Sequence, residues 1–173
     1  MSEIPMNTNE IEAILRELSD KLFNAITKWD NCGFIGIRSG GELIAKKVVE
    51  LLRQKTGKDL PLGALDIALY RDDISKRLYY PEVRSTDVPF SVDEKEIILV
   101  DDVLHTGRSV RAAIDHIVDL GRPERIYLLV LFDRGGRELP IQADFVGRVI
   151  DLPEEKIIKI DISKGDVLIS EVK

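Results

Sequence analysis

The chain has 173 residues, 44% of them hydrophobic and 32% charged, so we expect one globular domain over residues 1–173 with its own buried core. A net charge of −6 argues against a dedicated nucleic-acid binder, and the single cysteine, Cys32, rules out an internal disulfide and a cysteine-based zinc site. No apolar run approaches the ~18 residues of a membrane span, and the polar N-terminus does not resemble a signal peptide, so a cytoplasmic protein is expected.

Helix and strand patterns alternate from the start of the chain. Apolar residues at helical spacing predict a first helix over 9–26. The apolar stretch CGFIGI predicts a strand over 32–37, which ends at the polar turn 38–41. A second helix is predicted over 42–55, closed by Gly57.

The middle of the chain repeats this alternation after one interruption. The period-2 pattern of LGALDIALY predicts a strand over 62–70. Residues 71–91 are polar and without a clean period, which is typical of a functional or mobile loop. EIILV predicts a strand over 96–100, a helix follows over 108–120, and RIYLLVLF predicts a strand over 125–132.

Short strands are also expected over 144–150, 156–160 and 166–170. Because several strands are apolar throughout, we expect an α/β fold with a parallel sheet covered on both faces and joined by right-handed crossovers. In such a sheet the ligand binds beyond the carboxyl ends of the strands. The segments predicted to meet there are Arg38–Gly41, Tyr70–Asp73, Asp101–Ser109 and Asp133–Gly136.

The stretch EIILVDDVLHTGRSVRAAI combines two kinds of ligand-binding group. Asp101 and Asp102 are acceptors suited to sugar hydroxyls, with Mg²⁺ expected nearby. Gly107 lets the backbone approach a ligand, the next helix offers its N-terminal N–H groups, and Thr106 and Ser109 add hydroxyl donors, which together suit one phosphate monoester. An isolated Asp-Asp pair would simply end a strand, but the whole stretch predicts a ribose 5-phosphate site.

This stretch closely resembles the ribosyl-pyrophosphate signature of type I phosphoribosyltransferases. The segments LYRDDISK, DVPF, VDDVLHTGR, VRAAID, VDLGRP and DRGGRELPI further resemble the PyrR family, which combines uracil phosphoribosyltransferase activity with regulation of pyrimidine genes by RNA attenuation. The similarity covers nearly the whole chain after Asn31. It implies a type I phosphoribosyltransferase fold, in which helices flank a central, mainly parallel sheet and a small hood covers the site.

The resemblance also implies a reaction and its partners. Uracil and phosphoribosyl pyrophosphate (PRPP) would give UMP and pyrophosphate, with Mg²⁺ carried by PRPP and no direct protein ligand to the metal. A homodimer or a higher homo-oligomer matches the habit of the family. The leader mRNA of pyrimidine (pyr) genes would be a further partner.

Site residues are implied by position within the matching segments. Asp101 and Asp102 would hold the ribose hydroxyls and, with Arg71 from a closing loop, carry catalysis. Asp133 and Arg134 would face the base. The remaining contacts to PRPP and UMP would come from Arg38, Ser39, Gly40, Gly41, Val103, Leu104, His105, Thr106, Gly107, Arg108 and Ser109.

The chain departs from the family pattern at two places. Bacillus-type members carry Lys-Thr-Arg-Gly where this chain has Arg38-Ser39-Gly40-Gly41, so a positive charge stands at the first position and the one at the third position is missing. Arg38 either compensates or the affinity for pyrophosphate falls. His105 stands where tyrosine is common, and it is either a donor to the phosphate or a polar loop residue.

Arg137 and Arg148 are the candidate RNA contacts, beside a first helix of mixed charge. Three alternatives to a uracil phosphoribosyltransferase stay open. One is an RNA-binding regulator with weak or vestigial catalysis, and another is a phosphoribosyltransferase for hypoxanthine, guanine or orotate. The third is a phosphatase or receiver-like domain that uses Asp101.

Overall fold

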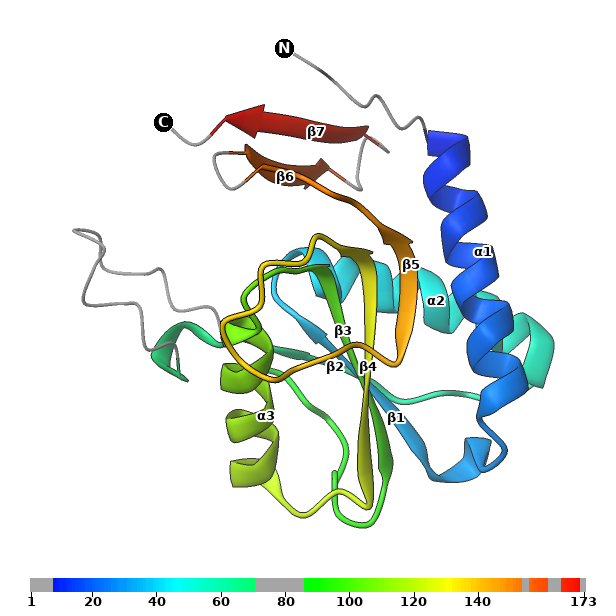
Figure 1. The fold of residues 1–173 in the computed structure, drawn as a ribbon. Helices are drawn as coiled ribbons and strands as arrows, with labels where there is room; N and C mark the ends of the chain where they lie inside the picture. Colours follow the sequence, from blue (N-terminus) through cyan, green and yellow to red (C-terminus); the bar gives the residue numbers. More distant parts are fainter. Residues whose placement is uncertain (1–7, 71–85, 154–155, 162–165, 172–173) are drawn as a thin grey trace.

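The computed structural model describes residues 8–70, 86–153, 156–161 and 166–171 (Figure 1). Its helices are α1 (Thr8–Ala25), α2 (Gly40–Thr56) and α3 (Arg108–Leu120), with 3₁₀ turns η1 (Trp29–Asn31) and η2 (Ala68–Tyr70). Its strands are β1 (Cys32–Ile37), β2 (Leu62–Leu65), β3 (Glu96–Leu104), β4 (Arg125–Asp133), β5 (Phe145–Val149), β6 (Lys156–Asp161) and β7 (Asp166–Glu171).

Five strands form one sheet in the order β2-β1-β3-β4-β5, and every neighbouring pair is parallel. β6 and β7 form a separate antiparallel pair. Figure 1 shows this pair beyond the carboxyl end of β5, on the side of the sheet where α3 begins. The predicted parallel α/β sheet with a small hood is confirmed.

Two apolar cores lie on the two faces of the sheet, because alternate residues of a strand point to opposite faces. On β3, Ile98 and Val100 pack with α1 and α2. Ile97 and Leu99 pack with α3 instead. This explains why the sequence of β3 is a continuous apolar run.

None of the helices in the described ranges combines the length and apolar character needed to cross a membrane.

The predicted strand over 62–70 is wrong in its second half. β2 ends at Leu65, and the carboxylate of Asp66 accepts a hydrogen bond from the backbone N–H of Ala68 at 2.8 Å. The backbone N–H of Asp66 donates to the Thr86 hydroxyl at 3.2 Å. An aspartate that bonds two residues ahead favours a turn over a strand ladder, so the chain enters η2.

The strand predicted over 96–100 is longer than expected. β3 continues to Leu104, where it pairs with Asp133 of β4, and therefore contains Asp101 and Asp102. α2 likewise begins at Gly40, two residues before the predicted start. Both carboxylates thus stand on a paired strand, which holds them more rigidly than a loop.

Arg71 and most of the loop predicted over 71–91 lie outside the described residues. The described end of this stretch returns to the sheet at Asp87. Its backbone exchanges two hydrogen bonds with Ala64, at 2.7 and 2.9 Å, next to the end of β2.

Replacing Leu18 of α1 by alanine is expected to destabilise the protein by about 3 kcal/mol, since this side chain is fully buried in the α1–α2 core and its removal leaves a cavity. Val118→Ala serves as a control, because Val118 is 59% exposed and its truncation should change stability by less than about 0.5 kcal/mol. Urea unfolding of both variants measures the difference. Equal stabilities would contradict the packing of α1 described here.

Candidate functional site

The carboxyl ends of β1, β3 and β4 bring three of the four predicted polar segments together: 38–41, 101–109 and 133–136. Of the fourth segment only Tyr70 is described. Its ring stacks on His116 of α3 with centroids 4.4 Å apart, and its hydroxyl donates to Asp119 at 2.9 Å. That hydrogen bond and partial burial raise the pKa of the Tyr70 hydroxyl.

The turn after β1 lies directly against β3, and glycine makes this possible. A Cβ on Gly40 would sit 2.2 Å from Asp102 Oδ2, and a Cβ on Gly41 would sit 2.3 Å from the carbonyl oxygen of Val100. No other residue type fits at these distances. The peptide bond between Arg38 and Ser39 at the start of this turn is cis.

Arg38 precedes α2 and pairs with the first turn of that helix. Its guanidinium lies 3.6 Å from the carboxylate of Glu42, which also binds Lys46 at 2.8 Å. About a fifth of the Arg38 side chain is exposed, so the charge that takes the first position of the turn is partly neutralised and partly buried. Whether it binds pyrophosphate stays a prediction.

Asp101 and Asp102 lie side by side on β3 but face different ways. Strand alternation directs Asp102 to the face of α2, consistent with its contact to Gly40, and directs Asp101 to the face of α3. Asp101 is 6% exposed and its Oδ1 accepts the Asp102 N–H at 2.9 Å. Asp102 Oδ1 accepts the Val103 N–H at 2.8 Å, so its other oxygen faces the glycine turn.

The loop after β3 leads straight into α3. Gly107 is the N-cap residue with a φ of +89°, a left-handed conformation that glycine adopts without strain. The Thr106 hydroxyl accepts the Arg108 N–H at 3.3 Å, and Ser109 lies in the first helical turn. The first N–H groups of a helix and its dipole favour an anion at this point.

The ring of His105 lies against the turn that follows β4. A Cβ on Gly136 would come within 2.8 Å of His105 Nε2. Gly136 has a φ of +68°, which strains any larger residue, and a Cβ there would also require the His105 ring to shift. The ring therefore lies between the loop after β3 and the turn after β4. That His105 donates a hydrogen bond to a phosphate stays a prediction.

Arg134 is buried and binds the backbone that leads to the hood. Its Nη1 donates to the Lys156 carbonyl at 2.6 Å, and its Nη2 donates to the Pro153 carbonyl at 3.1 Å. The arginine thus anchors the hood to the end of β4. Its predicted contact with a base stays a prediction.

Asp133 ends β4 in an ion pair with Arg137 and accepts the Gly135 N–H at 2.9 Å. Partial burial opposes ionisation of this carboxyl, but the hydrogen bonds from Arg137 and Gly135 outweigh it and hold the pKa of Asp133 below its ordinary value. Asp133 is therefore a carboxylate at neutral pH, able to accept but not to donate a hydrogen bond.

The two candidate RNA contacts lie in different surroundings. Arg137 turns toward the loop after β3, where it donates to the His105 carbonyl at 3.0 Å. Arg148 of β5 forms a two-pronged ion pair with Glu17 of α1, at 2.6 and 3.0 Å, and 41% of its side chain is exposed. Arg148 thus lies on the α1–β5 surface predicted for RNA, whereas Arg137 lies within the convergent segments.

One residue that the sequence did not single out also belongs to this region. Glu138 accepts a hydrogen bond from Arg108 Nε at 2.5 Å and so joins the start of α3 to the segment after β4. No motif marks this glutamate, because the pairing depends on how two loops far apart in sequence meet.

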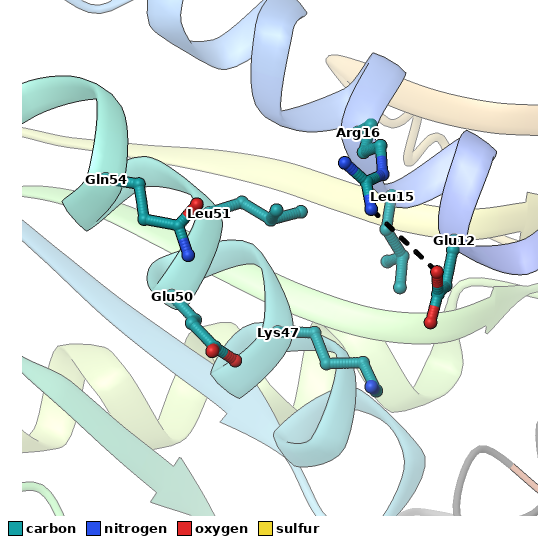
Figure 2. A pocket seen from close by; sticks show the side chains of 7 residues that line it. All are labelled: Glu12, Leu15, Arg16, Lys47, Glu50, Leu51 and Gln54. Atoms are coloured by element: carbon teal, nitrogen blue, oxygen red, sulfur yellow. Dashed lines mark ion pairs between the residues drawn. The ribbon is translucent and has the colours of Figure 1, made fainter.

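Two surface hollows lie away from the convergent segments. One of about 330 Å³ lies between α1 and α2, and Figure 2 shows its side chains. Its lining residues are Glu12, Leu15, Arg16, Lys47, Glu50, Leu51 and Gln54. The other, of about 690 Å³, lies near the amino ends of β3 and β4, at residues 31, 93–94 and 122–124.

Within the described ranges, no group of three or more His, Cys, Asp or Glu side chains is arranged so that it could hold a metal ion.

Comparison with known proteins defines the class first. Residues 6–159 match the family model of the phosphoribosyl transferase domain, so the chain belongs to that family. A solved hypoxanthine-guanine phosphoribosyltransferase from Bacillus anthracis superposes with a TM-score of 0.73 over 99% of this chain and 98% of that one. Its sequence is 15% identical, so this likeness concerns the fold alone.

Curated relatives narrow the class to one branch. The bifunctional protein PyrR of Thermus aquaticus is 43% identical over 161 residues, which cover 93% of this chain and 89% of the relative. The bifunctional protein PyrR of Bacillus mycoides (strain KBAB4) is 42% identical over 165 residues, covering 94% and 92%. Within the phosphoribosyltransferases, the chain belongs to the PyrR family.

Proposed function

We propose that the protein is a uracil phosphoribosyltransferase that forms UMP and pyrophosphate from uracil and PRPP, and that it also regulates pyrimidine genes by binding their leader mRNA. One observation carries the enzymatic part. The Asp102 carboxylate lies against the glycine turn at 38–41, on the strand whose next loop opens α3. Diphosphate, ribose and 5-phosphate groups of one PRPP molecule match these three neighbouring positions.

The chain's residues act on this reaction mainly by position and charge. The bond from the anomeric carbon to the diphosphate breaks, a bond to a uracil nitrogen forms, and that nitrogen loses its proton. The ribose becomes electron-poor in between, so the carboxylates of Asp101 and Asp102 stabilise it. The start of α3 and the glycine turn hold the two phosphate ends of the substrate at a fixed separation.

A magnesium ion fits this arrangement as a companion of PRPP. Asp102 Oδ2, which faces the glycine turn, is the carboxylate oxygen placed to accept ribose hydroxyls or the hydration shell of such an ion. When bound, Mg²⁺ neutralises charge on the leaving diphosphate.

We further propose that the enzyme works in the cytoplasm as a homodimer or a higher homo-oligomer.

A panel of bases tests the enzymatic proposal. The purified protein with PRPP and Mg²⁺ is offered uracil, hypoxanthine, guanine and orotate, and the nucleotide formed is measured against a protein-free control. UMP should form at least about 100-fold faster than the other nucleotides, because a site that hydrogen-bonds one base leaves polar groups unpaired with another. A faster reaction with another base would reassign the substrate, and no nucleotide from any base would overturn the activity.

The regulatory part rests on the α1–β5 surface. Arg148 is exposed there, with Glu17 of α1 as its ion-pair partner. Because the local charge is mixed, we expect the bound RNA to displace this carboxylate, and binding to weaken steeply with salt. Binding of a pyr leader stem-loop should strengthen with UMP and weaken in Arg148→Ala. RNA affinity that changes neither with UMP nor with the RNA sequence would contradict a regulatory role.

A further inference from the structure

The segment that follows β4 lies across the loop between β3 and α3. Backbone and side-chain donors of residues 134–139 reach three consecutive carbonyl oxygens, that of the last residue of β3 and those of the first two residues of the loop. The pairs are Arg134 N to Leu104 O at 3.0 Å, Arg137 Nη1 to His105 O at 3.0 Å, and Glu138 N and Leu139 N to Thr106 O at 3.0 and 3.2 Å. The loop is therefore fixed from one side along its whole length.

These bonds decide which way the loop presents its N–H groups. In a trans peptide the carbonyl and the N–H point in opposite directions. With the carbonyls of residues 104–106 turned toward the 134–139 segment, the N–H groups of residues 105–107 point away from it. Successive N–H groups aimed to one side, next to a helix N-terminus, form a concave site for an anion.

Packing holds the same orientation. A Cβ on Gly107 would lie 3.3 Å from Ile141 and 3.5 Å from Leu139, so these two side chains leave little room beyond the glycine. The ion pair of Arg108 with Glu138 closes the contact at the start of α3. Loop and segment thus form one unit rather than two separate loops.

Arg137 differs from the other donors of this unit, because it reaches the loop through its side chain. Its Nη1 binds the His105 carbonyl, its Nε binds the Ile141 carbonyl at 2.8 Å, and its Nη2 pairs with Asp133. About a quarter of the side chain is exposed. The guanidinium thus links the loop, the end of β4 and Ile141, two residues past the segment, at one point, as its planar fork of donors allows.

We propose that Arg137 is a positioning residue, which holds the loop so that its N–H groups meet the 5-phosphate of PRPP and UMP. The proposal rests on the proposed function, because it assigns that phosphate to this loop. It gives Arg137 a role inside the protein, in place of a direct contact with RNA. The charge of the Arg137 side chain matters less here than its ability to bridge three acceptors at once.

Three variants test this role, with UMP and ribose 5-phosphate as probes and calorimetry as the measurement, in the absence of RNA. In Arg137→Ala the affinity for both probes should fall about 10- to 100-fold, the size expected when a binding group is misplaced by about 1 Å. Uridine, which lacks the phosphate, should lose much less affinity than UMP in Arg137→Ala, and any loss reports on Asp133, the carboxylate partner of Arg137. Arg137→Lys should stay weak, since a single ammonium cannot bridge the three acceptors.

Arg53→Ala is the matched control, because Arg53 also combines a carboxylate partner, Asp59 at 2.7 Å, with a backbone carbonyl, Leu60 O at 3.1 Å, away from the site. It should leave the affinities unchanged. Melting curves of all three variants check that each is folded. Unchanged UMP affinity in Arg137→Ala, or full affinity in Arg137→Lys, would overturn the positioning role. If the unchanged protein binds neither UMP nor ribose 5-phosphate, both the proposed function and the positioning role of Arg137 are wrong.

Discussion

The Asp102→Asn variant is expected to lose UMP synthesis by about 100-fold or more while it keeps its fold. The substitution retains the Oδ1 acceptor that binds the Val103 N–H at 2.8 Å. It replaces the charged oxygen beside the glycine turn with a neutral NH₂ group, a donor where ribose hydroxyls need an acceptor. The initial rate of UMP formation at saturating substrates measures the effect.

Asp144→Asn is the control for this experiment. The Asp144 carboxylate also accepts a backbone N–H, that of Leu128 at 2.8 Å, but it precedes β5 and lies away from the convergent segments. It should retain the full rate. An Asp102→Asn protein with the rate of the unchanged enzyme would show that this carboxylate does not touch the reacting ribose.

The Gly40→Ala variant is expected to lose about 100-fold in activity, because the new methyl group would collide with Asp102. Its Cβ would lie 2.2 Å from Oδ2, 2.6 Å from Cγ and 2.9 Å from Cβ of that residue. Rotation of so short a side chain does not clear all three atoms, so the carboxylate must shift together with its strand or the turn must withdraw. Either response separates the diphosphate and ribose positions.

Gly57→Ala, at the other end of α2, is the control for Gly40→Ala. A Cβ there meets nothing within 4 Å, although the φ of +67° makes alanine unfavourable by about 1 kcal/mol. This variant should melt slightly earlier and keep its activity, whereas Gly40→Ala loses activity out of proportion to its stability. Full activity in Gly40→Ala would contradict the close approach of the turn to β3.

Much of the fold follows from local pattern. Apolar runs at 32–37 and 125–132 are predicted as buried parallel strands, and both are confirmed. The pattern failed where a side chain redirects the backbone, as Asp66 does after β2. It also stopped β3 too early, because two aspartates look like the end of an apolar strand although the ladder with β4 continues past them.

The site was predictable in outline but not in its connections. The rule that ligands bind at the carboxyl ends of parallel strands is enough to bring the turn at 38–41 and the loop after β3 together. Which side chains then meet is a matter of tertiary geometry. Arg137 looks like a surface cation in the sequence, yet it bonds the carbonyl of a residue 32 positions away. The cis bond after Arg38 likewise has no local signal.

The most direct test of the central claim is a crystal structure of the protein with UMP. We expect the 5-phosphate within hydrogen-bond distance of the backbone N–H groups at the start of α3 and in the loop before it, residues 106–109. The ribose hydroxyls should face Asp101 and Asp102. A phosphate bound at the turn 38–41 instead, or a nucleotide seated away from β3, would contradict the account.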